Sequence, residues 1–180
     1  MKKITGGVCA AQGFKANGVH CGIRKNKTKR DLSLIVSDVR AAAACVYTQN
    51  LVKGAPILVT KKHVADGYAQ AIVCNSGNAN TCNADGVEIA EGMCSLVEKY
   101  TGIPANDVVV ASTGVIGQPL SLEPIAGGME PLVKGLGENS DFAAQGIMTT
   151  DTVEKQVAYT FELGGKECRI GAIGKGVGMI

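Results

Sequence analysis

The chain has 180 residues, of which 46% are hydrophobic and 19% are charged, and its formal net charge at pH 7 is +2. This composition excludes a disordered chain and is typical of a folded protein with one substantial core. Four tyrosines, three phenylalanines and no tryptophan leave no basic, aromatic-rich face, so we expect no nucleic-acid partner.

The first half of the chain predicts four strands. The stretch 31–38 alternates and then becomes apolar, and β-branched and aromatic residues favour β structure in 43–50. Apolar runs at 56–64 and 69–77 predict two further strands, and the second runs into a polar, glycine-bearing turn. Lysines and arginines cluster at 23–31, which we interpret as the solvated tip of a hairpin.

The second half predicts a mixture of helices and strands. Apolar residues recur every three to four positions in 86–102, which indicates an amphipathic helix, and 107–113 indicates a buried strand. The stretch 121–136 is helical but interrupted by glycines and a proline, and 141–152 predicts a helix running into a turn. Two alternating strands around a Gly-Gly turn predict a hairpin over 155–174.

These elements predict the α/β class, in the mixed α+β form, with layered, glycine-rich sheets and helices. The order of strands and helices lacks a regular βαβ repeat. No linker, low-complexity tract or internal repeat divides the chain, so we expect a single domain over residues 1–180.

Membrane, secretory and metal-binding classes have little support in the sequence. No run approaches the ~20 apolar residues of a membrane helix, and Gly6-Gly7 interrupts the N-terminal segment before a signal-peptide core develops. The seven cysteines contain no Cys-x-x-Cys pair, and the two histidines lie far apart. We therefore expect no metal site, and we expect free thiols in a reducing cytoplasm.

Three segments have the composition of a binding or catalytic site. In the first, 72–86, a predicted strand is followed by a series of asparagines and glycines. This composition suits a binding site, but it suits a simple polar turn equally well. The second segment, 108–117, places Thr113 and Gly114 in a turn at the end of a strand. The threonine hydroxyl and the unhindered N–H of the glycine can form an oxyanion hole, or the pair is simply a Thr-Gly turn. The third comprises 147–152 and the glycine-flanked Lys175, whose ammonium group suits a carboxylate or phosphate.

No complete catalytic set follows from these segments. Lys175 is followed by Gly176 rather than Ser or Thr, so the phosphate-binding P-loop pattern is not met. His20 and His63 adjoin no nucleophile elbow of the Gly-x-Ser-x-Gly type. The sequence thus has a turn suited to an oxyanion and a lysine suited to a carboxylate, but no evident nucleophile. This combination indicates half of an active site.

Six separated blocks carry a resemblance to a known family. They are GFKANGVHCGI, AACVYTQN, CNSGNANTCNADG, ASTGVIG, IMTTDT and IGKGVGMI, in that order along the chain. The chain closely resembles the α chain of ornithine acetyltransferase, also called the bifunctional glutamate N-acetyltransferase of arginine biosynthesis. The resemblance implies the fold shared by this family and the DmpA group.

The family resemblance also implies a partner chain. Members are made as one precursor that cuts itself just before a threonine, and the α and β chains stay associated, as an α2β2 heterotetramer. The new N-terminal threonine of the β chain is the nucleophile, so it lies outside this sequence. The apolar end Met179-Ile180 is then expected to pack against the β chain.

The implied reaction is a ping-pong transfer of acetyl from N-acetylornithine to glutamate. Thr113 and Gly114 match the oxyanion pair, Thr149 matches a substrate-binding position, and Lys175 matches a lysine that we assign to the substrate carboxylate. Thr150 and Thr152 stand close to Thr149, so the register there stays open. GKGVG has a valine where the family more often has serine. No cofactor is implied, and use of acetyl-CoA as a second acetyl donor stays open.

Two other functions remain as alternatives. A self-processing aminopeptidase of the DmpA-like group shares the N-terminal nucleophile but cleaves an amide instead of moving an acetyl group. A non-catalytic module would bind amino acids or carboxylates through Lys175 and Thr113 without turnover.

Overall fold

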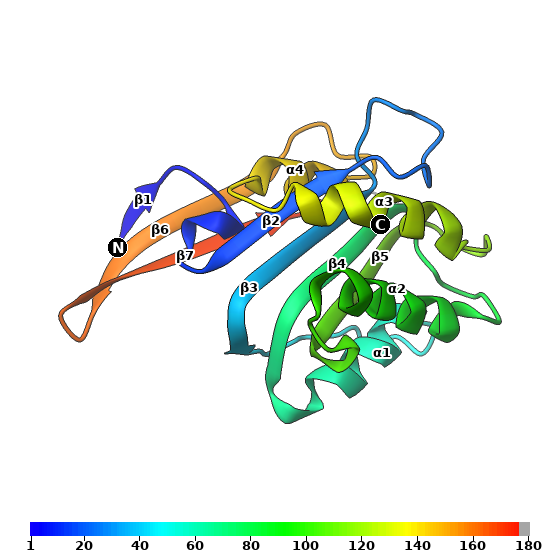
Figure 1. Ribbon diagram of the computed structural model, residues 1–180, viewed down its shortest axis with the longest axis horizontal. Coiled ribbons are helices and arrows are strands. Elements are labelled where there is room, and N and C mark those ends of the chain that lie inside the picture. Colours follow the sequence, from blue (N-terminus) through cyan, green and yellow to red (C-terminus); the bar gives the residue numbers. More distant parts are fainter. Residues whose placement is uncertain (177–180) are drawn as a thin grey trace.

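In a computed structural model, which describes residues 1–176, two β-sheets and four α-helices make up the regular structure (Figure 1). The strands are β1 (Lys2–Ile4), β2 (Phe14–Val19), β3 (Leu32–Ala42), β4 (Tyr68–Asn78), β5 (Val108–Val115), β6 (Lys155–Leu163) and β7 (Lys166–Gly174). The helices are α1 (Ala55–His63), α2 (Gly86–Thr101), α3 (Leu122–Lys134) and α4 (Ser140–Ile147). Short 3-10 helices are η1 (Val8–Ala10), η2 (Val64–Asp66) and η3 (Ala105–Asp107).

The larger sheet has the order β2-β3-β4-β5 and confirms the strands predicted at 31–38, 69–77 and 107–113. β2, β3 and β4 are antiparallel neighbours, whereas β4 and β5 run parallel. The connection between β4 and β5 carries α2, which confirms the helix predicted from apolar spacing. α2 ends at Gly102, whose φ of 77° is the left-handed conformation that commonly terminates helices.

The two faces of this sheet are covered differently. One face and helices α1, α2 and α3 form the main core. Its largest fully buried apolar side chains are Leu32, Leu34, Met93, Ile125, Met129, Leu132, Val59, Val73, Val97 and Val108. On the opposite face, Ser33 of β3 donates a hydrogen bond to the carbonyl of Ala143 in α4, at 2.9 Å. α4 contacts β2 and β3 most closely, so the β4 and β5 part of this face is less covered, and Ile72 is 41% exposed.

The smaller sheet has the order β1-β6-β7 and contains the predicted hairpin. Gly164 and Gly165 turn the chain with φ values of 59° and 75°, the backbone that a two-residue hairpin turn with positive φ requires. Figure 1 shows this hairpin projecting away from α1 and α2. At the end of the hairpin opposite this turn, β7 ends at Gly174, next to Lys175.

The strand predicted at 56–64 is wrong, because this segment forms α1. Pro56 lies in the first turn, where its missing N–H costs nothing, and three basic residues occupy the last turn. The buried residues Pro56, Val59, Thr60 and His63 follow helical spacing rather than alternation. The β-branched residues suggested a strand, but the helical spacing of the buried positions decides the structure.

Side chains of α1 form hydrogen bonds with backbone groups at the free edge of β5. The Thr60 hydroxyl donates to the carbonyl of Val110 at 2.8 Å and accepts from the N–H of the same residue at 3.0 Å. His63 Nδ1 lies 2.9 Å from the carbonyl of Val108. These side chains replace the strand that would otherwise pair with β5, and so protect an edge that could bind other chains.

The strand predicted at 43–50 is also wrong, because this segment has no regular structure. β3 ends at Ala42 after a bulge between Val36 and Ala41, and Val46 is fully exposed. The β-forming side chains of this segment have no neighbouring strand to pair with among residues 1–176.

The basic stretch 23–31 does connect the antiparallel strands β2 and β3, as predicted, but only its middle is solvated. Residues 25–29 are exposed, whereas Arg24 is half-buried and Asp31 is fully buried. Among the described residues no helix has the length and apolar character needed to cross a membrane.

The edge-capping hydroxyl of Thr60 gives a first testable prediction. Thr60→Val removes the hydroxyl and leaves the N–H and carbonyl of Val110 without their partner, so the free energy of unfolding should fall by about 1–3 kcal/mol. Urea unfolding measures this change. Thr5→Val, at an exposed position, is the matched control and should change little; equal stability of the two variants would contradict the capping role.

Candidate active site

The predicted oxyanion residues lie at the carboxyl end of β5. Thr113 pairs with Ser76 of β4, and Gly114 pairs with Gly77. Gly114 has a φ of 137°, and a Cβ there would lie 2.3 Å from the carbonyl carbon of Gly77. Only glycine therefore fits this position, both for conformation and for space.

Strand alternation directs the Gly114 N–H outward. Val110 directs its N–H away from β4, to the hydroxyl of Thr60. Successive residues of a strand direct their N–H groups to opposite edges of that strand, so Gly114, an even number of residues after Val110, shares its outward direction. A bare, outward N–H beside the Thr113 hydroxyl is the arrangement that an oxyanion hole needs.

A network of buried side chains fixes this turn. Ser112 Oγ donates to Asn75 Oδ1 at 2.6 Å, and Asn75 Nδ2 donates to the carbonyl of Asn78 at 2.9 Å. Asn78 in turn donates to the carbonyl of Gln118 at 2.9 Å and accepts from the N–H of Asn80 at 2.8 Å. The asparagine-rich segment is thus more than a surface turn, because it ties the end of β4 to the chain that follows β5.

Thr149 lies just beyond α4, and Arg24 joins it to the oxyanion turn. The Arg24 guanidinium donates to the carbonyls of Met148 and Thr149, each at 2.9 Å. The stem of Arg24 lies against Gly77, where an added Cβ would come within 2.8 Å of Arg24 Cγ. Arg24 therefore spans the distance from the substrate position predicted at Thr149 to the glycine that faces Gly114.

A buried carboxylate holds Arg24 in place. Asp31 is 0% exposed and accepts hydrogen bonds from the backbone N–H groups of Cys21, Gly22 and Arg24, at 2.6, 3.3 and 2.8 Å. His20 Nδ1 lies 3.3 Å from the same carboxylate. The sequence analysis missed both Arg24 and Asp31, because it interpreted 23–31 as one solvated stretch. The signal that could have identified them is a single aspartate at the end of a basic loop.

Lys175 lies beside a second buried carboxylate, Asp151. Its Nζ is 3.5 Å from Asp151 Oδ2 and donates to the carbonyl of Gly176 at 2.9 Å. Asp151 also accepts from the N–H of Gly176 at 2.6 Å, from Lys155 Nζ at 2.9 Å and from the N–H of Thr149 at 3.2 Å. Asp151 thus links the predicted substrate residues Thr149 and Lys175, which are separated by the whole β6–β7 hairpin.

Two lysines face one aspartate at this point. The Lys155 ammonium, the Gly176 N–H and the Thr149 N–H, with the charge of Lys175, hold the pKa of the Asp151 carboxyl well below its ordinary 3.8. Asp151 therefore remains negative, and one positive charge of the pair Lys155 and Lys175 is left uncompensated. The glycines on either side of Lys175 do not leave its side chain open to solvent, since it is only 22% exposed.

Cys74 of β4 borders the same region. Burial raises the pKa of its thiol to about 12, although the nearby positive charge of Lys175 opposes this rise. The thiol is thus protonated at neutral pH and is a poor nucleophile. Cys74 lies two residues before Ser76 on one face of β4, so Lys175 approaches the face that carries Thr113.

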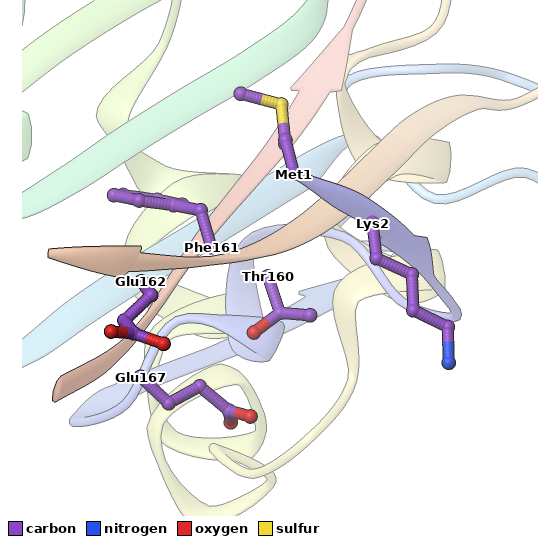
Figure 2. Close-up of a pocket in the computed structure, with 6 residues that line it drawn as sticks. All are labelled: Met1, Lys2, Thr160, Phe161, Glu162 and Glu167. Carbon is purple, nitrogen blue, oxygen red and sulfur yellow. The ribbon is translucent and has the colours of Figure 1, made fainter. Parts of the chain in front are cut away.

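His63 and the hollow on the small sheet lie apart from these residues. His63 is bound to β5 and to Glu91, whose Oε2 lies 3.1 Å from Nε2. A hollow of about 340 Å³ on the small sheet is lined by Met1, Lys2, Thr160, Phe161, Glu162 and Glu167. Figure 2 shows its Lys2 directed away from the two glutamates, so this hollow lacks converging polar groups.

Three residues predicted from the sequence, Thr113, Gly114 and Lys175, thus lie around the ends of β4 and β5. The charge of Lys175 acts on Cys74, which lies on the face of β4 where Ser76 pairs with Thr113. Thr149 joins them through Arg24 and Asp151. Val177, Met179 and Ile180, on which other expectations depend, lie outside the described residues. In residues 1–176 no group of three or more His, Cys, Asp or Glu is placed to hold a metal ion.

Comparison with known proteins identifies relatives along the whole chain. The model of the ArgJ family matches residues 15–180. The arginine biosynthesis bifunctional protein ArgJ of Symbiobacterium thermophilum is 44% identical over 183 residues, which cover 100% of this chain and 46% of that protein. The protein of the same name from Geobacter sulfurreducens is 47% identical, over 94% of this chain and 43% of its own length. The chain therefore spans less than half the length of these relatives.

Solved structures show the same fold. A crystal structure of ArgJ from Bacillus halodurans matches with a TM-score of 0.92 at 39% identity, and covers 99% of this chain and 94% of that one. Ornithine acetyltransferase from Mycobacterium tuberculosis, solved with ornithine, matches with a TM-score of 0.88 at 35% identity, over 97% and 94% of the two chains. The fold class predicted from the sequence is confirmed.

The close approach of β4 and β5 gives a prediction for Gly114. Gly114→Ala places a methyl group against the backbone of Gly77 at a φ that alanine rarely adopts, so unfolding should become easier by about 1–3 kcal/mol. Gly127→Ala is the control, because that helical position has open space and gains about 0.5–1 kcal/mol from alanine. Urea unfolding compares them, and an unaltered Gly114→Ala variant would refute the packing argument.

The Asp151 carboxylate gives a prediction of pH dependence. Its pKa is lowered in the folded chain, so its contribution to stability is complete above the unfolded pKa, near 3.8, and disappears as the pH falls further toward the lowered value. Asp151→Asn should therefore be less stable than the parent by a constant amount between about pH 5 and 7. The difference should shrink below about pH 4.

Thermal unfolding at a series of pH values measures this difference. Asp38→Asn is the control, because Asp38 forms an exposed ion pair with Lys15 in which both side chains are about half exposed. That variant should differ little from the parent at any pH. A stability gap for Asp151→Asn that persists unchanged under acid conditions would show that the charge of Asp151 is unimportant.

Proposed function

The chain belongs to the ArgJ family, and on that premise we propose that it is the α chain of an acetyltransferase that moves acetyl from N-acetylornithine to glutamate. One observation carries the proposal: Thr113, Gly114, Thr149 and Lys175 are dispersed over 60 residues, yet Arg24 and Asp151 connect them at one end of the larger sheet. This arrangement supplies oxyanion donors and a cation for a carboxylate, which are the needs of acyl transfer to an amino acid.

The lengths of the relatives support a two-chain enzyme. This chain covers 43–46% of the curated proteins but 94% of the matching crystal chains. Crystal chains of about this length, in a family whose curated members are about twice as long, are what cleavage of a precursor would produce. We therefore propose a β chain from the same precursor as the partner, in an α2β2 heterotetramer formed after self-cleavage.

In the proposed reaction the nucleophile is the N-terminal threonine of the β chain. Its α-amino group, with an ordinary pKa near ~8, takes the hydroxyl proton as the oxygen attacks the acetyl carbonyl of N-acetylornithine. The tetrahedral intermediate collapses, the C–N bond breaks, and ornithine leaves with the proton. The amino group of glutamate then attacks the acetyl-threonine ester, and N-acetylglutamate is released as the threonine hydroxyl is restored.

The residues of this chain act on both half-reactions. Thr113 Oγ1 and the N–H of Gly114 donate to the oxyanion that forms twice, and Lys175 pairs with the substrate carboxylate through a charge-assisted contact. Thr149, held by Arg24 and Asp151, positions the substrate. The mechanism needs no cofactor or metal, and acetyl-CoA is a candidate second donor of the acetyl group.

We also propose that the enzyme works in the cytoplasm. All seven cysteines are free thiols, as is usual for proteins in a reducing compartment.

A mass spectrum and an acetyl-transfer assay test the proposal. Expression from the intact gene should give two chains, one of which begins with threonine, and the purified enzyme should move acetyl from N-acetylornithine to glutamate. Hydrolysis of peptide amides without transfer would instead support the aminopeptidase. A single uncleaved chain that binds amino acids without turnover would support the binding module.

Thr113→Ala tests the oxyanion assignment. Loss of one oxyanion donor typically lowers kcat by about 10²–10³-fold, and KM should change little because the hydroxyl is needed chiefly in the transition state. Steady-state kinetics of the two-chain enzyme measure both values. Thr160→Ala is the control, because Thr160 lies on the small sheet and its hydroxyl bonds the carbonyl of Cys168. Equal loss of affinity and rate in Thr113→Ala would contradict the assignment.

A further inference from the structure

Ser76 of β4 has a buried hydroxyl that nothing in residues 1–176 binds. The residue is 0% exposed, and its Oγ has no hydrogen-bond partner in the part of the chain that the structure describes. Buried hydroxyls are nearly always paired, and leaving one unpaired costs about 1–3 kcal/mol. Nearby serines follow this rule: Ser33 donates to Ala143 and Ser112 donates to Asn75.

Strand pairing places this hydroxyl beside Thr113. Ser76 and Thr113 are direct partners in the parallel pairing of β4 and β5, so their side chains project from the same face of the sheet. Neighbouring strands lie about 4.8 Å apart, so rotation of these two short side chains can bring their hydroxyls together, although Ser76 is unpaired among the described residues of this structure. Ser112, the neighbour of Thr113, cannot serve instead, because its hydroxyl faces the other way and is bound to Asn75.

The full burial of Ser76 limits what it can do. A hydroxyl that solvent cannot reach does not touch a substrate, so any catalytic effect must pass through a neighbour. Thr113 is such a neighbour, because its hydroxyl carries one proton and two lone pairs and rotates freely about its C–O bond. An oxyanion donor is effective when its proton already points to the developing charge.

We propose that Ser76 is a positioning residue that donates a hydrogen bond to Thr113 Oγ1 and so directs the Thr113 proton toward the oxyanion. This inference rests on the proposed acetyltransferase function. The unpaired hydroxyl then has a purpose: it leaves Ser76 free to donate to Thr113 when the hydroxyl of Thr113 itself is engaged by the oxyanion. Cooperative chains of this kind strengthen each hydrogen bond in them.

A double-mutant cycle in the complete two-chain enzyme tests this proposal. Ser76→Ala should lower kcat about tenfold, less than the ~10²–10³-fold of losing the donor itself, and leave KM unchanged. In the Thr113→Ala background, Ser76→Ala should have no further effect on kcat, because the residue through which it acts is gone. Rates are expressed per cleaved enzyme, with cleavage followed by mass spectrometry.

Ser33→Ala is the matched control. Ser33 is buried on the same face of the sheet, but its hydroxyl is bound to α4, so its loss should lower the melting temperature and leave kcat unchanged. If Ser76→Ala does not assemble, Ser76→Cys keeps the volume with a weaker donor and serves in the same cycle.

Two results would overturn the proposal. One is an unchanged kcat in Ser76→Ala; the other is the same fold-loss of kcat with and without Thr113, which would indicate a general structural role. Absence of acetyl transfer in the parent enzyme is a separate outcome, since it defeats the proposed function before Ser76 is tested.

Discussion

The close approach of two glycines is the constraint on which the site depends. β4 and β5 run parallel, and the backbone of β4 leaves no room for a side chain at Gly114, while the side chains of Arg24 and Ile23 fill the space beside Gly77. The absence of a side chain at Gly77 lets the stem of Arg24 lie against this strand. The conformation of the chain at Gly114 and the link to Thr149 therefore both depend on positions that only glycine fits.

Buried charge then connects this turn to the rest of the molecule. Asp31 gathers the backbone N–H groups of the β2–β3 loop and holds Arg24, while Asp151 gathers those around the base of the hairpin. Both carboxylates are satisfied largely by backbone groups, whose positions cannot change without unfolding of a loop. Side chains from loops are thus fixed as firmly as those on strands, which is what precise placement of a substrate requires.

The sequence predicted correctly the elements whose signals lie within the segment itself. It predicted wrongly the segments whose structure depends on which strands pair with each other. The helix 86–102 and the Gly164-Gly165 hairpin were predicted because spacing and turn chemistry act within the segment itself. The segments 43–50 and 56–64 have strand-forming composition, but the edge of β5 is bound by Thr60, so one becomes a helix and the other stays irregular. Such competition for a sheet edge is invisible until the fold exists.

The candidate site shows the same division. Thr113, Gly114, Thr149 and Lys175 were identified from the resemblance of motifs, and each such motif holds its residue in a short run. Arg24 was missed because it contacts a backbone group 125 positions away, and both Arg24 and Asp31 lie in a charged run that suggested solvent. Asp151 was missed because its partners Lys175 and Gly176 meet it only in the folded chain. Sequence motifs identify the groups that meet a substrate more readily than the groups that hold them.

The balance of charge at the base of the hairpin completes the argument. Asp151 is nearly unexposed and needs a cation, but Lys155 at 2.9 Å already supplies one. Lys175 lies further away, at 3.5 Å, and so adds a positive charge that Asp151 only partly offsets. In the function that we propose, the substrate carboxylate lies beside Lys175 and relieves this excess without displacing Lys155. Lys175 then binds the ligand, and Lys155 stabilises the fold.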